Sequence, residues 1–172
     1  MSQLIHNEFS YAKELIFKPC GFECSEPIAE KESGEYGACI FKLNGTHVRF
    51  RVAKITPTKT GQFVTFWKRV KNGTIQPYDT SDDTDIFIIV TRTHDNVGQF
   101  IFPKNILSKH DIISNNHQGG KRAIRVYPPW DITTSFQAKR TQAWQLEYFL
   151  ETAKDKQVDH SRAKILYGLG GI

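Results

Sequence analysis

The chain has 172 residues, 39% of them hydrophobic, and a formal net charge of +5 at pH 7. This length and composition predict one domain over residues 1–172, because the chain can bury a core of its own and contains no repeat or low-complexity tract. No apolar run approaches the roughly 18 residues of a membrane span, and the first residues lack the layout of a signal peptide. We therefore expect a cytoplasmic protein that does not bind membranes.

The N-terminal segment predicts one helix followed by a connector. Apolar residues recur at helical spacing over residues 2–17, until Pro19 and Gly21 end the pattern. Residues 26–35, EPIAEKESGE, are acidic and contain Pro and Gly. Such a composition is typical of a solvated connector.

Asn44-Gly45 predicts a β-hairpin, because it separates two runs of alternating apolar and polar residues and both turn positions need a positive φ. A two-residue turn fixes the register of the two strands. The expected pairs are Phe41 with Val48, Cys39 with Phe50, Ile40 with Arg49, and Ala38 with Arg51. One face of the hairpin is then apolar and the other carries the arginines.

The rest of the chain predicts further strands, with helices towards the C-terminus. Residues 62–70 are expected to form a central strand covered on both sides, and residues 134–154 a long helix that opens with a capping box at Thr134 and Gln137. The remaining predicted elements are a buried strand over 85–90, a strand over 99–104 after a turn at Val97-Gly98, a short helix over 104–112, a strand over 123–128, and a last helix over 159–169 that stops at Gly168. Hairpins flanked by helices predict an α+β fold with a mostly antiparallel mixed sheet.

Charge is strongly segregated around the hairpin. Between Tyr36 and Tyr78 there are eight Lys or Arg and no Asp or Glu. A basic block attracts polyanions, because each neutralised phosphate releases counterions, and interleaved aromatic residues suit nucleic acid. A solvated sheet face explains the charge equally well. The predicted contacts with DNA or RNA in this block are Arg49, Arg51, Lys54, Lys59, Lys68 and Arg69.

A second basic stretch, GGKRAIRVYPPW, begins at Gly119. Its two glycines make the backbone flexible before Lys121 and Arg122, and Arg125 follows at strand spacing. A basic loop with an aromatic residue beyond it suits single-stranded nucleic acid, whose exposed bases can stack. The alternative is that Arg125 pairs inside the fold with a carboxylate of the acidic loop, residues 79–85.

Four segments resemble the MepB-like family of small bacterial proteins. They read FKLNGTHVRFRVAKITPTKTGQFVTFWKR, GQFIFPK, GKRAIRVYPPW and QAKRTQAWQLEYF, and the resemblance runs from about Phe9 to Phe149. It implies a fold similar to type II restriction endonucleases, together with nucleic-acid binding.

A nuclease of that fold needs an Asp at a strand edge and an acidic-x-Lys tripeptide on the neighbouring strand, because two carboxylates hold Mg²⁺. No Asp or Glu in the chain has a Lys two residues later. Asp85 begins a strand, and Lys54 and Lys104 end strands. A rearranged nuclease site is therefore kept as an alternative, with Gln99 in place of the missing acid.

Other catalytic or metal-binding patterns are absent from the sequence. The acidic loop lacks EF-hand spacing, so turn and capping roles are favoured over a divalent cation. Three cysteines without a second Cys or His pair at zinc-finger spacing favour reduced thiols, and we expect no cofactor.

The sequence is compatible with three functions. The first is nucleic-acid binding without catalysis and with little sequence preference. The second is a Mg-dependent nuclease with a rearranged site. The third is a protein-interaction module that uses Trp67, Trp130 and Trp144 as anchors, two of which we expect in the core.

Overall fold

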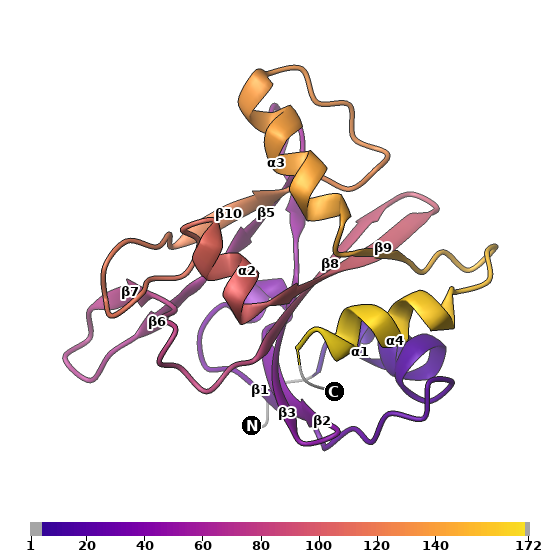
Figure 1. Ribbon diagram of the computed structural model, residues 1–172, viewed down its shortest axis with the longest axis horizontal. Helices are drawn as coiled ribbons and strands as arrows, with labels where there is room; N and C mark the ends of the chain where they lie inside the picture. Colours follow the sequence, from indigo (N-terminus) through magenta and orange to yellow (C-terminus); the bar gives the residue numbers. More distant parts are fainter. Residues whose placement is uncertain (1–4, 171–172) are drawn as a thin grey trace.

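The computed structural model describes residues 5–170, in which strands form three sheets with helices around them (Figure 1). The main sheet has the order β1-β2-β3-β8-β9-β11, a second sheet has the order β10-β5-β4, and β6 pairs with β7. The strands are β1 (Ile28–Ala29), β2 (Cys39–Leu43), β3 (Thr46–Val52), β4 (Lys54–Ile55), β5 (Gln62–Thr65), β6 (Trp67–Arg69), β7 (Ile75–Pro77), β8 (Ile86–Thr93), β9 (Asn96–Pro103), β10 (Ala123–Val126) and β11 (Phe149–Glu151). The helices are α1 (Asn7–Ala12), continued by a π-helical turn at Lys13–Phe17, α2 (Lys104–Lys109), α3 (Phe136–Leu146) and α4 (His160–Gly168).

The predicted α+β class with a mostly antiparallel mixed sheet is confirmed. Neighbouring strands of the main sheet run antiparallel except β3 and β8, which pair in parallel from Val48 opposite Ile86 to Val52 opposite Val90. The helices expected near both ends and after β9 are also present, although residues 2–4 of the first lie outside the described part of the chain. None of the described helices is long and apolar enough to cross a bilayer.

The main sheet separates two hydrophobic cores. On one face, α1 and α4 pack over the sheet through side chains such as Phe9, Phe17 and Tyr167. On the other face, the second sheet and α2 pack against β8 and β9, with Val64 and Leu107 fully buried there. The second sheet is therefore attached to the main sheet by a core of its own.

The β2–β3 hairpin has the predicted turn and register. Asn44 and Gly45 have φ values of 50° and 79°, as a two-residue turn requires. Cys39 lies opposite Phe50, Ile40 opposite Arg49 and Phe41 opposite Val48. The chain then leaves the main sheet after Val52 and joins the second sheet as β4.

The structure differs from the prediction of one central strand over residues 62–70. The strand breaks at Phe66, whose backbone N–H donates to Arg122 O while its side chain packs against Tyr78 and Phe87. β5 therefore lies in the second sheet and β6 in a separate pair. The aromatic rings at 63 and 67 are half-buried, so this segment is not covered on both sides.

The structure also differs from the turn predicted at Val97-Gly98. The chain turns at His94 and Asp95, and Gly98 lies within β9 opposite Glu151 of β11. A Cβ at Gly98 would lie 2.2 Å from Cζ of Phe149. Glycine is needed here because β11 approaches closely.

The helix predicted over residues 134–154 is shorter than expected. It ends at Leu146 because the following residues pair with the edge of β9 as β11. Its N-cap is Ser135, whose hydroxyl accepts from Ala138 N at 3.1 Å, in place of the predicted Thr134.

The acidic segment 26–35 is not a solvated connector. It forms β1, which pairs with β2, and a 3-10 turn at Gly34–Tyr36. Its carboxylates consequently lie beside the basic hairpin.

Candidate nucleic-acid interface

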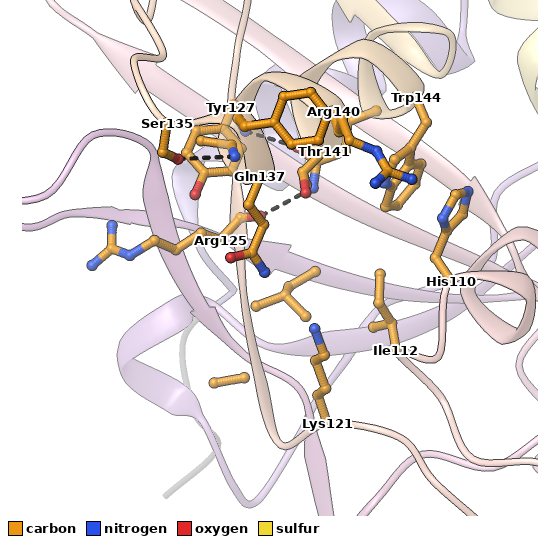
Figure 2. Close-up of a pocket in the computed structure, with 15 residues that line it drawn as sticks. His110, Ile112, Lys121, Arg125, Tyr127, Ser135, Gln137, Arg140, Thr141 and Trp144 are labelled. Atoms are coloured by element: carbon orange, nitrogen blue, oxygen red, sulfur yellow. Dashed lines mark hydrogen bonds between the residues drawn. The ribbon is translucent and has the colours of Figure 1, made fainter.

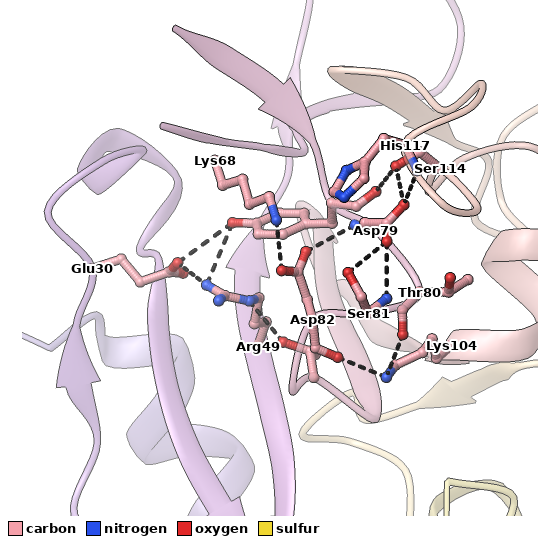
Figure 3. A network of polar contacts seen from close by, with 12 residues as sticks. Glu30, Arg49, Lys68, Asp79, Thr80, Ser81, Asp82, Lys104, Ser114 and His117 are labelled. Carbon is pink, nitrogen blue, oxygen red and sulfur yellow. Dashed lines mark hydrogen bonds and ion pairs between the residues drawn. The ribbon is translucent and has the colours of Figure 1, made fainter. Parts of the chain in front are cut away.

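The arginines of the hairpin belong to an ion cluster, of which Figure 3 shows Arg49 beside Glu30. Arg49 and Arg51 both form ion pairs with the carboxylate of Glu30, and Arg51 Nη2 donates to the hydroxyl of Tyr78 at 2.6 Å. The side chain of Arg51 is only 5% exposed. The expectation of an exposed arginine face is therefore wrong for Arg51, because the acidic segment folds back over it.

Acidic residues also neutralise three further cations of this block. Segment 26–35 and the acidic loop supply carboxylates at 2.6 to 3.1 Å from the basic nitrogens. The pairs are Lys54 with Glu35, Lys68 with Asp82, and Arg69 with Glu32. Five of the nine predicted contact residues thus have an acidic partner within the described part of the chain, which weakens their attraction for a polyanion.

The acidic loop is held by turn and capping hydrogen bonds, as predicted. Asp79 accepts from the backbone N–H and hydroxyl of Ser81, the hydroxyl of Ser114 and the backbone N–H of His117. Burial alone would raise the pKa of Asp79, but these hydrogen bonds hold it well below its usual range. Over residues 5–170, no group of three or more His, Cys, Asp or Glu could hold a metal ion.

The residues considered for a rearranged nuclease site do not all lie together, and Lys54, on β4, is paired with Glu35. Asp85 and Lys104 are neighbours, because Lys104 N donates to Asp85 O at 3.0 Å. Both side chains are engaged: Asp85 Oδ2 accepts from His47 N, and Lys104 Nζ donates to backbone oxygens of the acidic loop. Gln99 lies within β9, buried, where its amide oxygen accepts from the hydroxyl of Tyr167. The structure therefore does not bring Gln99 to Asp85.

A groove of about 700 Å³ lies between β10 and α3 (Figure 2). Lys121, Arg125 and Arg140 line it, and no Asp or Glu is among its described lining residues. Aromatic rings also line it, including Trp144 and Phe136, the latter 75% exposed. In Figure 2 the Lys121 side chain points into the groove from the side opposite α3.

The side chain of Arg125 is held in place by uncharged hydrogen-bond acceptors. Its guanidinium donates to Thr56 Oγ1 at 2.8 Å and to the carbonyl oxygens of Thr60 and Gly61, and it lies 5.9 Å from the ring centroid of Phe63. The alternative that Arg125 pairs with the acidic loop is therefore wrong. Neutral acceptors orient this cation, and no carboxylate in the described part of the chain forms an ion pair with it.

One end of the groove is formed by two stacked rings. The imidazole of His110 lies parallel to the indole of Trp144, with centroids 3.9 Å apart. Burial lowers the pKa of His110, and the neighbouring Lys109 lowers it further, so the ring is neutral at pH 7. Trp144 and Trp130 are half-buried against the second core, whereas Trp67 lies on β6 beneath Arg69.

Sequence reasoning found Lys121 and Arg125 but missed Phe136 and Arg140 of α3, and it named Trp144 only as an anchor for a protein partner. Phe136, Arg140 and Trp144 are spaced four apart, so they lie on one face of the helix. The spacing of four residues is the signal in the sequence that identifies this face.

Fold and groove together define a small α+β protein with a basic, aromatic-lined groove. The chain belongs to the MepB-like family, whose model matches residues 30–151. The crystal structure of MepB is similar to it, with 36% sequence identity, a TM-score of 0.73, and coverage of 76% of this chain and 88% of that one. A bacterial homing endonuclease, I-Ssp6803I, matches with 14% identity and a TM-score of 0.44 over 81% of this chain and 84% of its own. No curated protein matches the chain significantly.

Proposed function

We propose that the protein binds nucleic acid in the groove between β10 and α3, without catalysis and with little sequence preference. The observation that carries this proposal is the lining of the groove: Lys121, Arg125 and Arg140 with no carboxylate in its described part. Such a surface binds phosphates through counterion release, and exposed rings such as Phe136 offer bases a stacking surface that tolerates any sequence.

The cations available for this function are a subset of those expected from the sequence. Lys59 and Arg122 are exposed and have no ion-pair partner among residues 5–170, so we include them as flanking contacts. The cations paired with acids in the hairpin are secondary, because binding a phosphate there would first break an ion pair.

Binding without turnover fits the state of the candidate catalytic groups. Asp85 and Lys104 are bonded to the protein itself, and Gln99 is bonded to Tyr167. A cleavage site with two metal-holding carboxylates would need a second acid beside Asp85. The endonuclease-like architecture that the family resemblance implies would then serve to hold nucleic acid.

The test is fluorescence anisotropy with a labelled 12-nucleotide oligo(dT) over a salt series. Lys121→Ala combined with Arg140→Ala should weaken binding and flatten the slope of log K against log salt by about 1.4, since each single-strand phosphate contact contributes about 0.7. Lys42→Ala combined with Lys164→Ala removes the same charge from exposed positions outside the groove and should leave the slope nearly unchanged. An equal change in both double variants would place the contacts elsewhere.

The nuclease alternative is tested on the same protein. Incubation of the oligonucleotide and its duplex with Mg²⁺ or Mn²⁺ should give no cleavage above a blank. Cleavage that disappears in Asp85→Ala would replace the proposed function by a metal-dependent nuclease.

A further inference from the structure

The side chain of Gln145 bonds to the outer edge of β10 as a neighbouring strand would. Its Nε2 donates to Arg125 O at 3.0 Å, and its Oε1 accepts from Tyr127 N at 2.9 Å. Gln145 is 1% exposed, so this contact is fixed by the packing of α3. A planar group with one donor and one acceptor therefore fits this edge.

The same pair of backbone groups recurs one step along the strand, inside the groove. Phe66 N donates to Arg122 O, so the even-numbered residues of β10 bond to β5 and the odd-numbered ones face outward. Ala123 C=O and Arg125 N–H thus point away from β5, and neither has a hydrogen-bond partner among the described residues. Both residues line the groove.

We propose that Ala123 C=O and Arg125 N–H together bind the Watson–Crick edge of an unpaired nucleobase, an inference that rests on the proposed function. Each base carries on that edge an N–H donor next to an acceptor, which is the arrangement that the Gln145 carboxamide shows. Thymine N3–H would donate to Ala123 O, and a thymine carbonyl would accept from Arg125 N. In a duplex this edge already pairs with the complementary base, so the groove selects single strands.

The length of the open edge favours a base over a peptide. Gln145 covers the next pair of groups, and at the other end Lys121 N is already bonded to Ile112 O, so the outward-facing groups of β10 left open among the described residues are Ala123 N–H, Ala123 C=O and Arg125 N–H. An added peptide strand uses several alternate residues of an edge, whereas one base needs one pair. The cations around it also suit a ligand that carries phosphates.

The experiment compares three 12-nucleotide probes at fixed salt: oligo(dT), the same oligomer built from N3-methylthymidine, and the dT·dA duplex. Methylation keeps the phosphates and the stacking surface but removes the N3–H donor. We expect the methylated oligomer and the duplex to bind about tenfold more weakly than oligo(dT), within the range for loss of a bidentate base contact. The salt slopes of the two single strands should be equal.

Amide hydrogen exchange gives a second readout at the proposed contact. In the free protein the Arg125 amide should exchange faster than those of Ile124 and Val126, which face β5. Oligo(dT) should slow it at least tenfold, and the methylated oligomer should not.

The outcomes separate this inference from the proposed function. The inference would be overturned if the methylated and unmethylated oligomers bound with equal affinity or if the duplex bound tenfold more tightly. It would also be overturned if the Arg125 amide of the free protein exchanged as slowly as that of Val126. In each case nucleic-acid binding in the groove would still stand. Absence of any salt-dependent binding of oligo(dT) would overturn both.

Discussion

Replacing Glu30 by Gln removes the carboxylate that Arg49 and Arg51 share. The Arg51 side chain is 5% exposed, and its Nε has no hydrogen-bond partner among residues 5–170. The variant would therefore leave a buried guanidinium charge with only neutral acceptors, which include Tyr78 and a backbone oxygen. Removing one partner of a buried ion pair costs about 3–5 kcal/mol. Arg49 is 24% exposed and water can solvate it in part, which favours the lower end, about 3 kcal/mol.

Urea and thermal unfolding measure this loss. For a domain of this size, about 3 kcal/mol corresponds to a fall in Tm of about 6–12 °C. With a slope m of about 2 kcal/mol/M, the urea midpoint falls by about 1.5 M. Gln preserves the volume and one acceptor oxygen, so a loss of this size reports the charge.

Glu14→Gln is the matched control, because it makes the same chemical change in an exposed pair with Lys18. Surface pairs contribute about 0–1 kcal/mol, so this variant should unfold close to the wild type. If Glu30→Gln loses less than about 1 kcal/mol, or no more than Glu14→Gln, the argument that burial makes this cluster essential is refuted.

Three further predictions concern other parts of the fold. Gly98→Ala should destabilise the protein by about 1–3 kcal/mol in urea unfolding, because the new Cβ meets the ring of Phe149. A variant as stable as the wild type would contradict the close packing of β11 against β9. The pKa of Asp79 is lower in the folded state than in the unfolded chain, so its stabilising contribution is present above about pH 4 and is lost as pH falls below that value. The gap in urea midpoint between wild type and Asp79→Asn should therefore narrow between pH 5 and pH 3, and a constant gap would refute this linkage. Burial raises the pKa of Cys39 to about 12, so a thiol reagent at pH 8 should modify Cys20 of the native protein well before Cys39. Equal rates of modification would show that the core around Cys39 opens readily.

Local signals predicted the β2–β3 hairpin and the short helices α2 and α4. The Asn44-Gly45 turn fixes the register of β2 and β3 through backbone conformation alone, so no distant residue is needed to specify it. Gly168 likewise marked the C-terminal end of α4. The α+β class followed from the order of these elements.

Long-range partners could not be predicted from the sequence. Glu30 lies in a segment whose polar, Pro-containing composition is typical of a connector, and only the folded sheet shows that its carboxylate meets Arg49 and Arg51. The same limit applies to the groove. Lys121 and Arg125 were identified by their charge. Nothing in the sequence around Gln145 indicates that its side chain bonds to the backbone of β10, because that contact depends on how α3 packs.

Folding must bring β3 and β8 side by side although residues 53–85 separate them. The β2–β3 and β8–β9 hairpins close tight turns and can form locally, but their parallel docking requires closure of that long segment, whose entropic cost grows with its length. β10 pairs with β5 across a still longer stretch, and α3 follows β10. We therefore expect the hairpins to form first and the β10–α3 region last, as a late unit that can also open while the main sheet stays folded.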